Sequence, residues 1–364
     1  MKWFQTRTAV HTPGAARQQA RDGRASAMRL TASAQILAQL LLWVTFYGYD
    51  RALQTIWQAA LMLAVPFAAL WFLWRQGEQA VESRAGAYWA LPLMLCLLSD
   101  AALMLYVLCG YIDALIPEYA YPVGAVAVAA VCWLTLLLSR RDGVAYGTKV
   151  LRIPFILLFL LGTVVLRTSS RADRLWPILG QGFFNTAMAA LPGCGAVWGC
   201  ALLFLLPDKS AQPSPLRRSG YAFVPWVMGV LWALWYGFMR PWARGDALDV
   251  GERLMGLARH ADSVINYQLA GLMWLVLLPV ALTGCALGGE IILCRAVPKC
   301  PRALASGAVI GLALALVLIW PAQLPSVLEM VLPWRTAVSV VCGVGMWAAG
   351  GRVSPRRGGV QPAG

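Results

Sequence analysis

The stretch GFFNTAMAALPGCG, residues 182–195, decides how this sequence is read. It belongs to an apolar run, 181–206, that is long enough to cross a bilayer. Near the middle of the run, Pro192 lacks a backbone N–H, while Gly193 and Gly195 permit backbone angles outside the helical region. In hydrocarbon, freed backbone groups are tolerated only where protein or a water-filled cavity satisfies them. The stretch therefore predicts a membrane helix that is interrupted beside a cavity; a simple kink packed against a neighbour is the alternative.

The composition of the whole chain also indicates a membrane protein. Of 364 residues, 60% are hydrophobic and 13% are charged, whereas soluble domains have about 45–50% apolar and about 25% charged residues. This excludes a soluble enzyme, a secreted disulfide scaffold and a disordered protein. We predict an all-α polytopic membrane protein with about ten transmembrane helices. The apolar runs lie at 31–49, 53–74, 87–111, 119–139, 150–167, 181–206, 220–240, 266–293, 303–321 and 327–349.

The basic residues indicate the orientation of these spans. The net charge is +14, and with a cytoplasmic N-terminus most of the 30 Lys and Arg fall on the inner side of the membrane. This agrees with the positive-inside rule. We therefore expect a multi-pass protein of the cell membrane with cytoplasmic basic tails at 1–29 and 351–364. The charge needs no nucleic-acid partner to explain it.

The membrane domain, 30–350, divides into two sets of five spans, 30–167 and 175–350. Because the sixth span starts on the opposite side of the membrane from the first, two such repeats have inverted topology. Transporters built this way interrupt the first helix of each half near the midplane. Discontinuous helices are therefore expected in spans one and six.

The first span contains a weaker counterpart of the break in the sixth. Tyr47, Gly48 and Tyr49 place one glycine between two aromatic rings. If the span continues toward Gln58, Gly48 is the matching break; if the span ends at Tyr49, the rings form an interfacial belt. Free backbone amides at a half-helix N-terminus suit a ligand carboxylate. The predicted ligand-binding residues are Tyr47, Gly48, Tyr49, Pro192, Gly193, Cys194 and Gly195.

Asp100 is the one acid well inside an apolar run. An ionised carboxylate there costs several kcal/mol unless it is paired, so its side chain should face the bundle interior. It is a candidate ion or proton site. The alternative is a structural carboxyl that is bonded to Ser99 or Tyr106.

No sequence pattern indicates catalysis. The chain has no GxSxG, P-loop or HExxH motif, so we do not expect an enzyme. Most of its nine cysteines lie inside apolar runs, and they form no CxxC pair. Neither a metal site, a disulfide framework nor a cofactor is expected.

Several segments resemble the B subunit of bacterial spore germinant receptors, the endospore germination permeases of the amino acid–polyamine–organocation superfamily. The resemblance is collinear over about 140–275. At two points the sequence departs from the family pattern: Ile265–Gln268 replaces a charged group before span eight, and the usual Gly-Thr pattern of span one is not obvious. It is therefore similar to a divergent member. The resembling segments are Gly147–Arg152, Leu175–Gly182, Leu205–Pro207 and Asp262–Trp274.

The resemblance implies a LeuT-like fold that binds a germinant, such as an amino acid, at the membrane midplane. It also implies A and C receptor subunits as partners and the inner membrane of the spore as location. On this hypothesis the protein senses a small polar solute and signals by changing conformation. A secondary amino-acid transporter, with Asp100 as a proton site, is the first alternative, and a membrane scaffold is the second.

Overall fold

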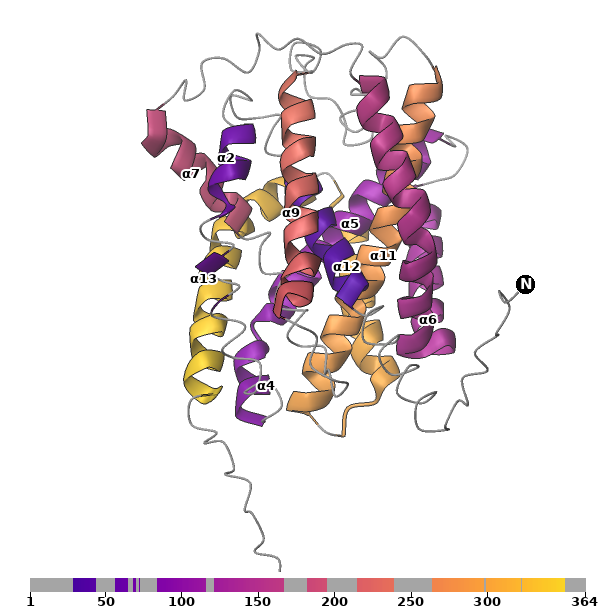
Figure 1. Cartoon of the computed structure of the whole chain (residues 1–364). Coiled ribbons are helices and arrows are strands. Elements are labelled where there is room, and N and C mark those ends of the chain that lie inside the picture. The colour runs from indigo at the N-terminus through magenta and orange to yellow at the C-terminus, as the bar shows by residue number, and fades with distance from the viewer. Residues whose placement is uncertain are drawn as a thin grey trace, which may run out of the picture.

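The structure, a computed structural model, describes eleven stretches of the chain, and nearly all of their residues are helical. Figure 1 shows these helices packed side by side as a bundle. No strand occurs within the described stretches. They comprise residues 29–43, 56–64, 68–69, 72, 84–115, 121–166, 182–194, 215–238, 264–297, 299–321 and 323–350.

Residues 29–43 form a helix at the centre of the bundle, called here the central helix. Every residue from 35 to 43 is buried, and all of them except Gln35 and Gln39 are apolar, as expected for a helix enclosed by others. The other helices are α2 (Ile56–Met62), α4 (Arg84–Ala90), α5 (Leu93–Leu115), α6 (Tyr121–Leu166), α7 (Gly182–Cys194), α9 (Pro215–Phe238), α11 (Val264–Ala296), α12 (Arg302–Ile319) and α13 (Leu324–Gly350).

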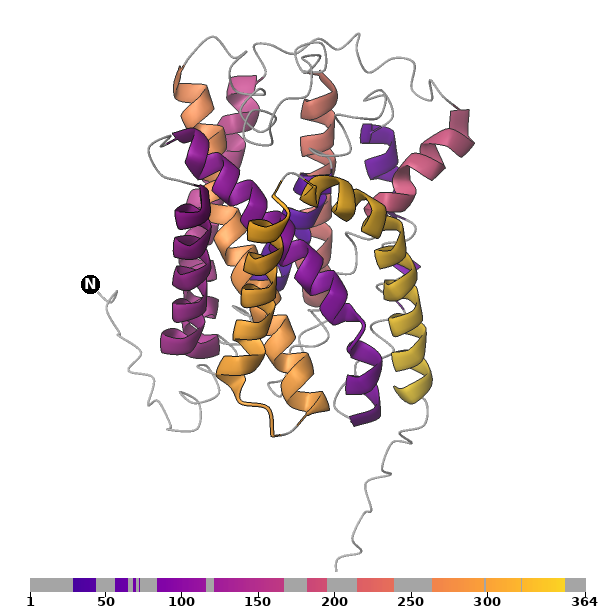
Figure 2. The same ribbon diagram turned by 180° about the vertical axis from the view of Figure 1, so that it is seen from behind.

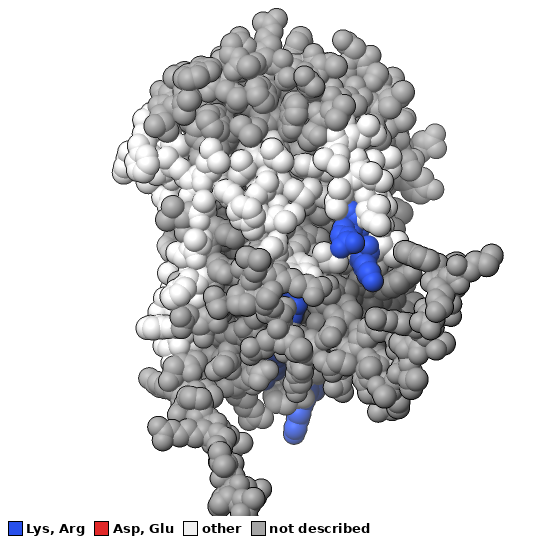
Figure 3. All heavy atoms as spheres, in the orientation of Figure 1, with Lys and Arg blue, Asp and Glu red and all other residues white. Residues whose placement is uncertain are grey.

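The surface of the described residues is that of a membrane protein. Three helical segments are long and apolar enough to cross a bilayer, namely Tyr88–Ile112, Leu272–Ala296 and Arg302–Ile319. Large apolar side chains are exposed, including Leu138 (81% exposed) and Phe184 (73%), whereas soluble proteins rarely expose large apolar patches. In Figure 3 the described surface is mostly uncharged, with a few basic groups. The predicted fold class, an all-α polytopic membrane protein, is confirmed.

Helix α6 differs from the expected arrangement. The sequence predicts two spans, 119–139 and 150–167, joined by a loop, but the structure keeps the intervening residues helical, giving one element of 46 residues. A straight helix of that length would extend about 69 Å, about twice the hydrocarbon thickness of a bilayer. Figures 1 and 2 show instead two limbs that meet at one end of the molecule. The two spans thus form a hairpin whose connection is itself helical.

The third predicted span, 87–111, contains a turn that separates α4 from α5. Pro92 supplies no backbone N–H and ends the continuous helix. The turn is closed by bonds between residues three apart: the Leu91 amide donates to the Tyr88 carbonyl at 3.2 Å, and the Met94 amide donates to the Leu91 carbonyl at 2.9 Å. This turn sets the direction in which α5 enters the bundle.

Helices α11 and α12 approach each other closely at Gly289. A Cβ atom added to this glycine would collide with the Val309 side chain and would also lie 3.3 Å from Met94 Cε. Gly311, which also lies in a helix, has no neighbour within 4 Å of an added Cβ. The two glycines therefore separate steric effects from helix propensity.

We expect Gly289→Ala to destabilise the protein by about 1–3 kcal/mol, because overpacking a close-packed interior forces its neighbours apart. Thermal denaturation of the detergent-purified protein measures this. Gly311→Ala is the control and should leave stability unchanged or slightly higher, since alanine favours helix. Equal melting temperatures for the two variants would contradict the close approach.

Candidate functional site

Four buried polar side chains come together inside the apolar bundle, and we call them the central polar cluster. Gln35 and Gln39 belong to the central helix, Asp100 to α5 and Arg335 to α13. Their exposed fractions are 0%, 4%, 2% and 5%. Charged groups buried this deeply in a membrane domain are costly and usually have a function.

Asp100 is held by two of the other members. The Arg335 guanidinium forms an ion pair with Asp100 Oδ1, and Gln39 Nε2 donates a hydrogen bond to Asp100 Oδ2. The Ser99 hydroxyl, which the sequence suggested as a partner, donates instead to the Cys96 carbonyl oxygen at 2.9 Å. Asp100 therefore faces the interior, as predicted, and its negative charge is matched by an arginine from a distant helix.

The central helix presents a polar stripe because three of its polar residues are spaced four apart. Thr31, Gln35 and Gln39 share one face, since residues i and i+4 are neighbours on a helix. Thr31 Oγ1 hydrogen-bonds Thr148 Oγ1 of α6 at 3.0 Å. Gln35 Nε2 donates to Cys285 Sγ of α11 at 2.8 Å. The stripe thus runs from α6 past α11 to the ion pair with α13.

The cluster keeps hydrogen-bonding capacity that other described residues do not use. Gln35 Oε1, Gln39 Oε1 and Arg335 Nε have no hydrogen-bond partner among the described residues. Burying a polar atom without a partner costs about 1–3 kcal/mol. The two carbonyl oxygens accept hydrogen bonds and the guanidinium donates them. A solute with both a cationic donor and an anionic acceptor complements this set.

The interruption predicted in span six, at Pro192–Gly195, falls at the limit of the described residues. Pro192 and Gly193 are in the last described turn, which ends at Cys194; Gly195 lies outside the described residues. The Thr336 hydroxyl of α13 donates to the Leu191 carbonyl oxygen at 3.3 Å. The last four carbonyls of a helix lack intrahelical partners, and a side-chain donor such as Thr336 is able to supply one.

Thr336 also relates the end of α7 to the cluster, because it directly follows Arg335 on α13. Asp100 and α7 thus contact neighbouring residues of α13: Asp100 pairs with Arg335, and the Leu191 carbonyl accepts a bond from Thr336. The residues predicted in span one, Tyr47, Gly48 and Tyr49, lie outside the described residues. The central helix is described up to residue 43, about one turn before them.

Three members of the cluster were missed by the sequence analysis. Arg335 is a cation inside the apolar run 327–349, which by itself marks a candidate functional residue. Gln35 and Gln39 stand one helical turn apart inside the first run. A search for polar residues of every kind at helical spacing, rather than for acids alone, finds all three.

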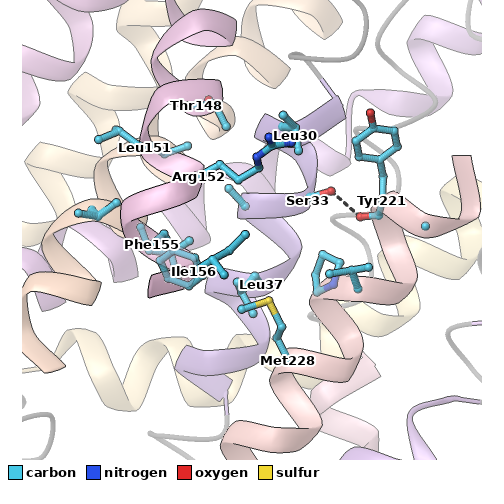
Figure 4. A pocket seen from close by; sticks show the side chains of 17 residues that line it. Leu30, Ser33, Leu37, Thr148, Leu151, Arg152, Phe155, Ile156, Tyr221 and Met228 are labelled. Atoms are coloured by element: carbon cyan, nitrogen blue, oxygen red, sulfur yellow. Dashed lines mark hydrogen bonds between the residues drawn. The ribbon is translucent and has the colours of Figure 1, made fainter. Parts of the chain in front are cut away.

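A cavity of about 340 Å³ lies on another side of the central helix, and we call it the side cavity. It is bounded by the central helix, α6, α9 and α11, and its lining is mostly apolar, with Leu37, Phe155 and Met228 among the side chains (Figure 4). Arg152 is the one charged residue among the described residues that line it. The Ser33 hydroxyl, also in the lining, donates to the Tyr221 carbonyl oxygen at 2.5 Å. The side cavity is thus an apolar space with one cation.

Aromatic rings connect the helices around the side cavity. The Phe159 ring of α6 lies 6.4 Å from the Trp232 ring of α9, measured between centroids. Trp232 in turn makes an edge-to-face contact with Trp274 of α11 at 6.1 Å. Such pairs contribute about 0.5–1.5 kcal/mol each beyond the area they bury. They fix the relative positions of three of the four walls.

No protein-family model and no curated protein sequence matches this chain. Among solved structures, the chain is similar to the crystal structure of the Eremococcus coleocola manganese transporter in complex with an aromatic bis-isothiourea substituted compound. The TM-score is 0.52 at 13% sequence identity, and the alignment covers 88% of this chain and 76% of that one. Two crystal structures of mutants of that transporter align over the same shares at 14% identity with a TM-score of 0.49. The similarity shows the fold, which is LeuT-like, and at this identity it shows no more than the fold.

Proposed function

We propose that this protein is a permease that binds a small zwitterionic solute, such as an amino acid, at the central polar cluster and carries it across the membrane. The observation that carries the proposal is the set of buried polar atoms on Gln35, Gln39 and Arg335 that have no partner among the described residues. The glutamine carbonyl oxygens would accept from the solute's ammonium group, and Arg335 would donate to its carboxylate. The fold shared with a transporter supports transport.

The Asp100–Arg335 ion pair supplies a physical link between solute binding and conformation. On the proposed division into repeats 30–167 and 175–350, Asp100 belongs to the first half and Arg335 to the second. The carboxylate of a bound solute competes with Asp100 for the same guanidinium. A solute shifts a conformational equilibrium only by its differential affinity for the two states. By weakening this ion pair, the solute would favour one arrangement of the two halves over the other.

The helix end at Pro192–Gly195 is part of the same proposal. We propose that α7 is interrupted there, that the segment Tyr47–Tyr49 is the corresponding region of the first span, and that their free backbone groups line the path of the solute. The bond from Thr336 to the Leu191 carbonyl supports a helix end at this level of α13. Half-helix ends near the midplane are how transporters of this architecture bind ions and charged substrate groups.

A second candidate function is solute sensing, as the B subunit of a spore germinant receptor in the inner spore membrane. It is supported by the sequence resemblance over 140–275. The same site would bind the germinant, and the conformational change would pass to A and C subunits instead of moving the solute. The two functions differ in flux, not in binding.

Uptake by proteoliposomes tests the proposal and separates the candidates. The protein is reconstituted in phosphatidylethanolamine and phosphatidylglycerol, and uptake of individual radiolabelled amino acids is measured with and without an inward proton gradient. We expect at least one amino acid to accumulate well above empty liposomes. Gln39→Leu should lower its uptake about tenfold, equivalent to about 1.4 kcal/mol. Gln323→Leu, at an exposed position outside the cluster, should leave it unchanged.

The other outcomes are equally informative. Thermal stabilisation by an amino acid without any flux would contradict transport and support sensing; co-purification with A and C subunits encoded beside it would then be expected. If no amino acid of the panel gives flux or thermal stabilisation, both candidate functions are contradicted. The membrane scaffold is then the remaining hypothesis.

A further inference from the structure

The side cavity borders the part of the protein that faces lipid. Its walls include α6 and α9, and next to the lining residues these helices expose large apolar side chains such as Ile153, Leu157 and Phe223. In a membrane, those exposed groups contact acyl chains. An apolar space beside them is therefore within reach of a lipid.

The polar groups of the side cavity are largely occupied by the protein itself. Ser33 is bonded to the Tyr221 carbonyl oxygen. The Thr148 hydroxyl contacts Thr31 Oγ1 and donates to the Val144 carbonyl. This leaves an apolar space that offers a polar solute few partners.

Arg152 makes the side cavity selective for charge. Its side chain is exposed and reaches along the lining beside Leu30 (Figure 4), and none of the described lining residues is acidic. Lys149 lies one turn earlier on α6 and is outside the lining. A cation at one part of an apolar cavity complements a molecule with an anionic head and an aliphatic chain.

We propose that the side cavity binds an anionic phospholipid of the bilayer, with one acyl chain along Leu37, Phe155 and Met228 and its phosphate at Arg152. The predicted orientation places Arg152 at the cytoplasmic face, where anionic lipids attract basic groups between helices. The lipid would contact the face of the central helix that includes Leu30, Ser33 and Leu37. Gln35 and Gln39 point to the other side of that helix, whereas Thr31 meets the lining at Thr148. The lipid and the proposed solute therefore contact different side chains.

The charge of the lipid head group is tested by thermal shift. Full-length protein is purified in maltoside detergent and depleted of lipid, and dioleoyl phosphatidylglycerol or dioleoyl phosphatidylcholine is added. We expect phosphatidylglycerol to raise the melting temperature about 2–4 °C more than phosphatidylcholine, as for a ligand that binds only the folded state. Arg152→Gln should abolish this difference, and Lys149→Gln should retain it.

The position of the acyl chain is tested by filling the cavity. Gly220 lines the side cavity, and a Cβ added there meets nothing within 4 Å, so leucine can extend into the space. Gly220→Leu should abolish stabilisation by phosphatidylglycerol. Gly147→Leu is the matched control, because its added Cβ also meets nothing within 4 Å and it lies outside the lining. Native mass spectrometry of wild type, R152Q and G220L, scored for retained phosphatidylglycerol, gives the same comparison without relying on melting temperatures.

Several results would overturn the lipid site. Equal stabilisation by the two lipids would show that Arg152 selects no anionic head group. Stabilisation by inorganic phosphate alone would show that Arg152 binds a free anion. Stabilisation by the free amino acid leucine, if G220L abolishes it, would show that the cavity binds a solute. If G220L retains phosphatidylglycerol fully, the acyl chain of the lipid does not lie in the side cavity.

Discussion

Replacing Arg335 with methionine should destabilise the protein by about 3–5 kcal/mol, because it leaves the Asp100 carboxylate buried without its cation. Asp100 is only 2% exposed, and its other bond, from Gln39, supplies no charge. In thermal denaturation the melting temperature should fall by roughly 10 °C. Arg302→Met, which removes an exposed cation at the start of α12, should change stability by less than about 0.5 kcal/mol.

The double variant Asp100→Leu/Arg335→Met separates the structural role of the pair from its functional role. Replacing both members of a buried ion pair with apolar residues is often neutral or stabilising. We therefore expect the double variant to regain most of the stability lost by Arg335→Met. Its amino-acid uptake should remain abolished, since the guanidinium that would bind the solute carboxylate is gone. Full uptake by a stable double variant would show that the cluster is not the solute site.

The fold class could be predicted from the sequence because it follows from composition. Apolar runs of spanning length locate most of the helices without knowledge of their contacts. The connection within α6 could not be predicted in this way. The residues between the two limbs, 140–149, are rich in charged residues and contain Gly143 and Gly147, a composition typical of a loop, yet the structure keeps them helical. Hydropathy distinguishes membrane from water, not helix from loop.

The site was only partly predictable for a related reason. An isolated acid in an apolar run indicated Asp100, and the cost of burying it indicated that a partner must exist. Its partner Arg335 lies 235 positions later in the sequence, and nothing local relates the two. Whether Gln39 and Arg335 reach the same carboxylate depends on how α5 and α13 pack against the central helix. The side cavity is hidden from sequence for the same reason, because residues of four helices line it.

A continuous helix at residues 192–195 should strongly reduce transport without harming the fold. The triple variant P192A/G193A/G195A restores one backbone N–H and replaces two glycines with the residue that favours helix most. If free backbone groups there bind the solute, uptake should fall at least about tenfold, a change of about 1.4 kcal/mol or more in transition-state free energy. The melting temperature should stay the same or rise, because alanine removes the local penalties of proline and glycine.

The control for this variant removes the same residue types from helices that are continuous in the structure. Pro154 lies inside α6 and Gly311 inside α12, so P154A/G311A adds helix propensity where no interruption exists, and its uptake should equal that of wild type. Thr336→Val tests the same helix end from the side of α13. It removes the hydroxyl that donates to the Leu191 carbonyl, and it should lower uptake in a protein with the interruption but have no further effect in the triple variant. Wild-type uptake by the triple variant would leave only the alternative, a kink in α7 that packs against its neighbours.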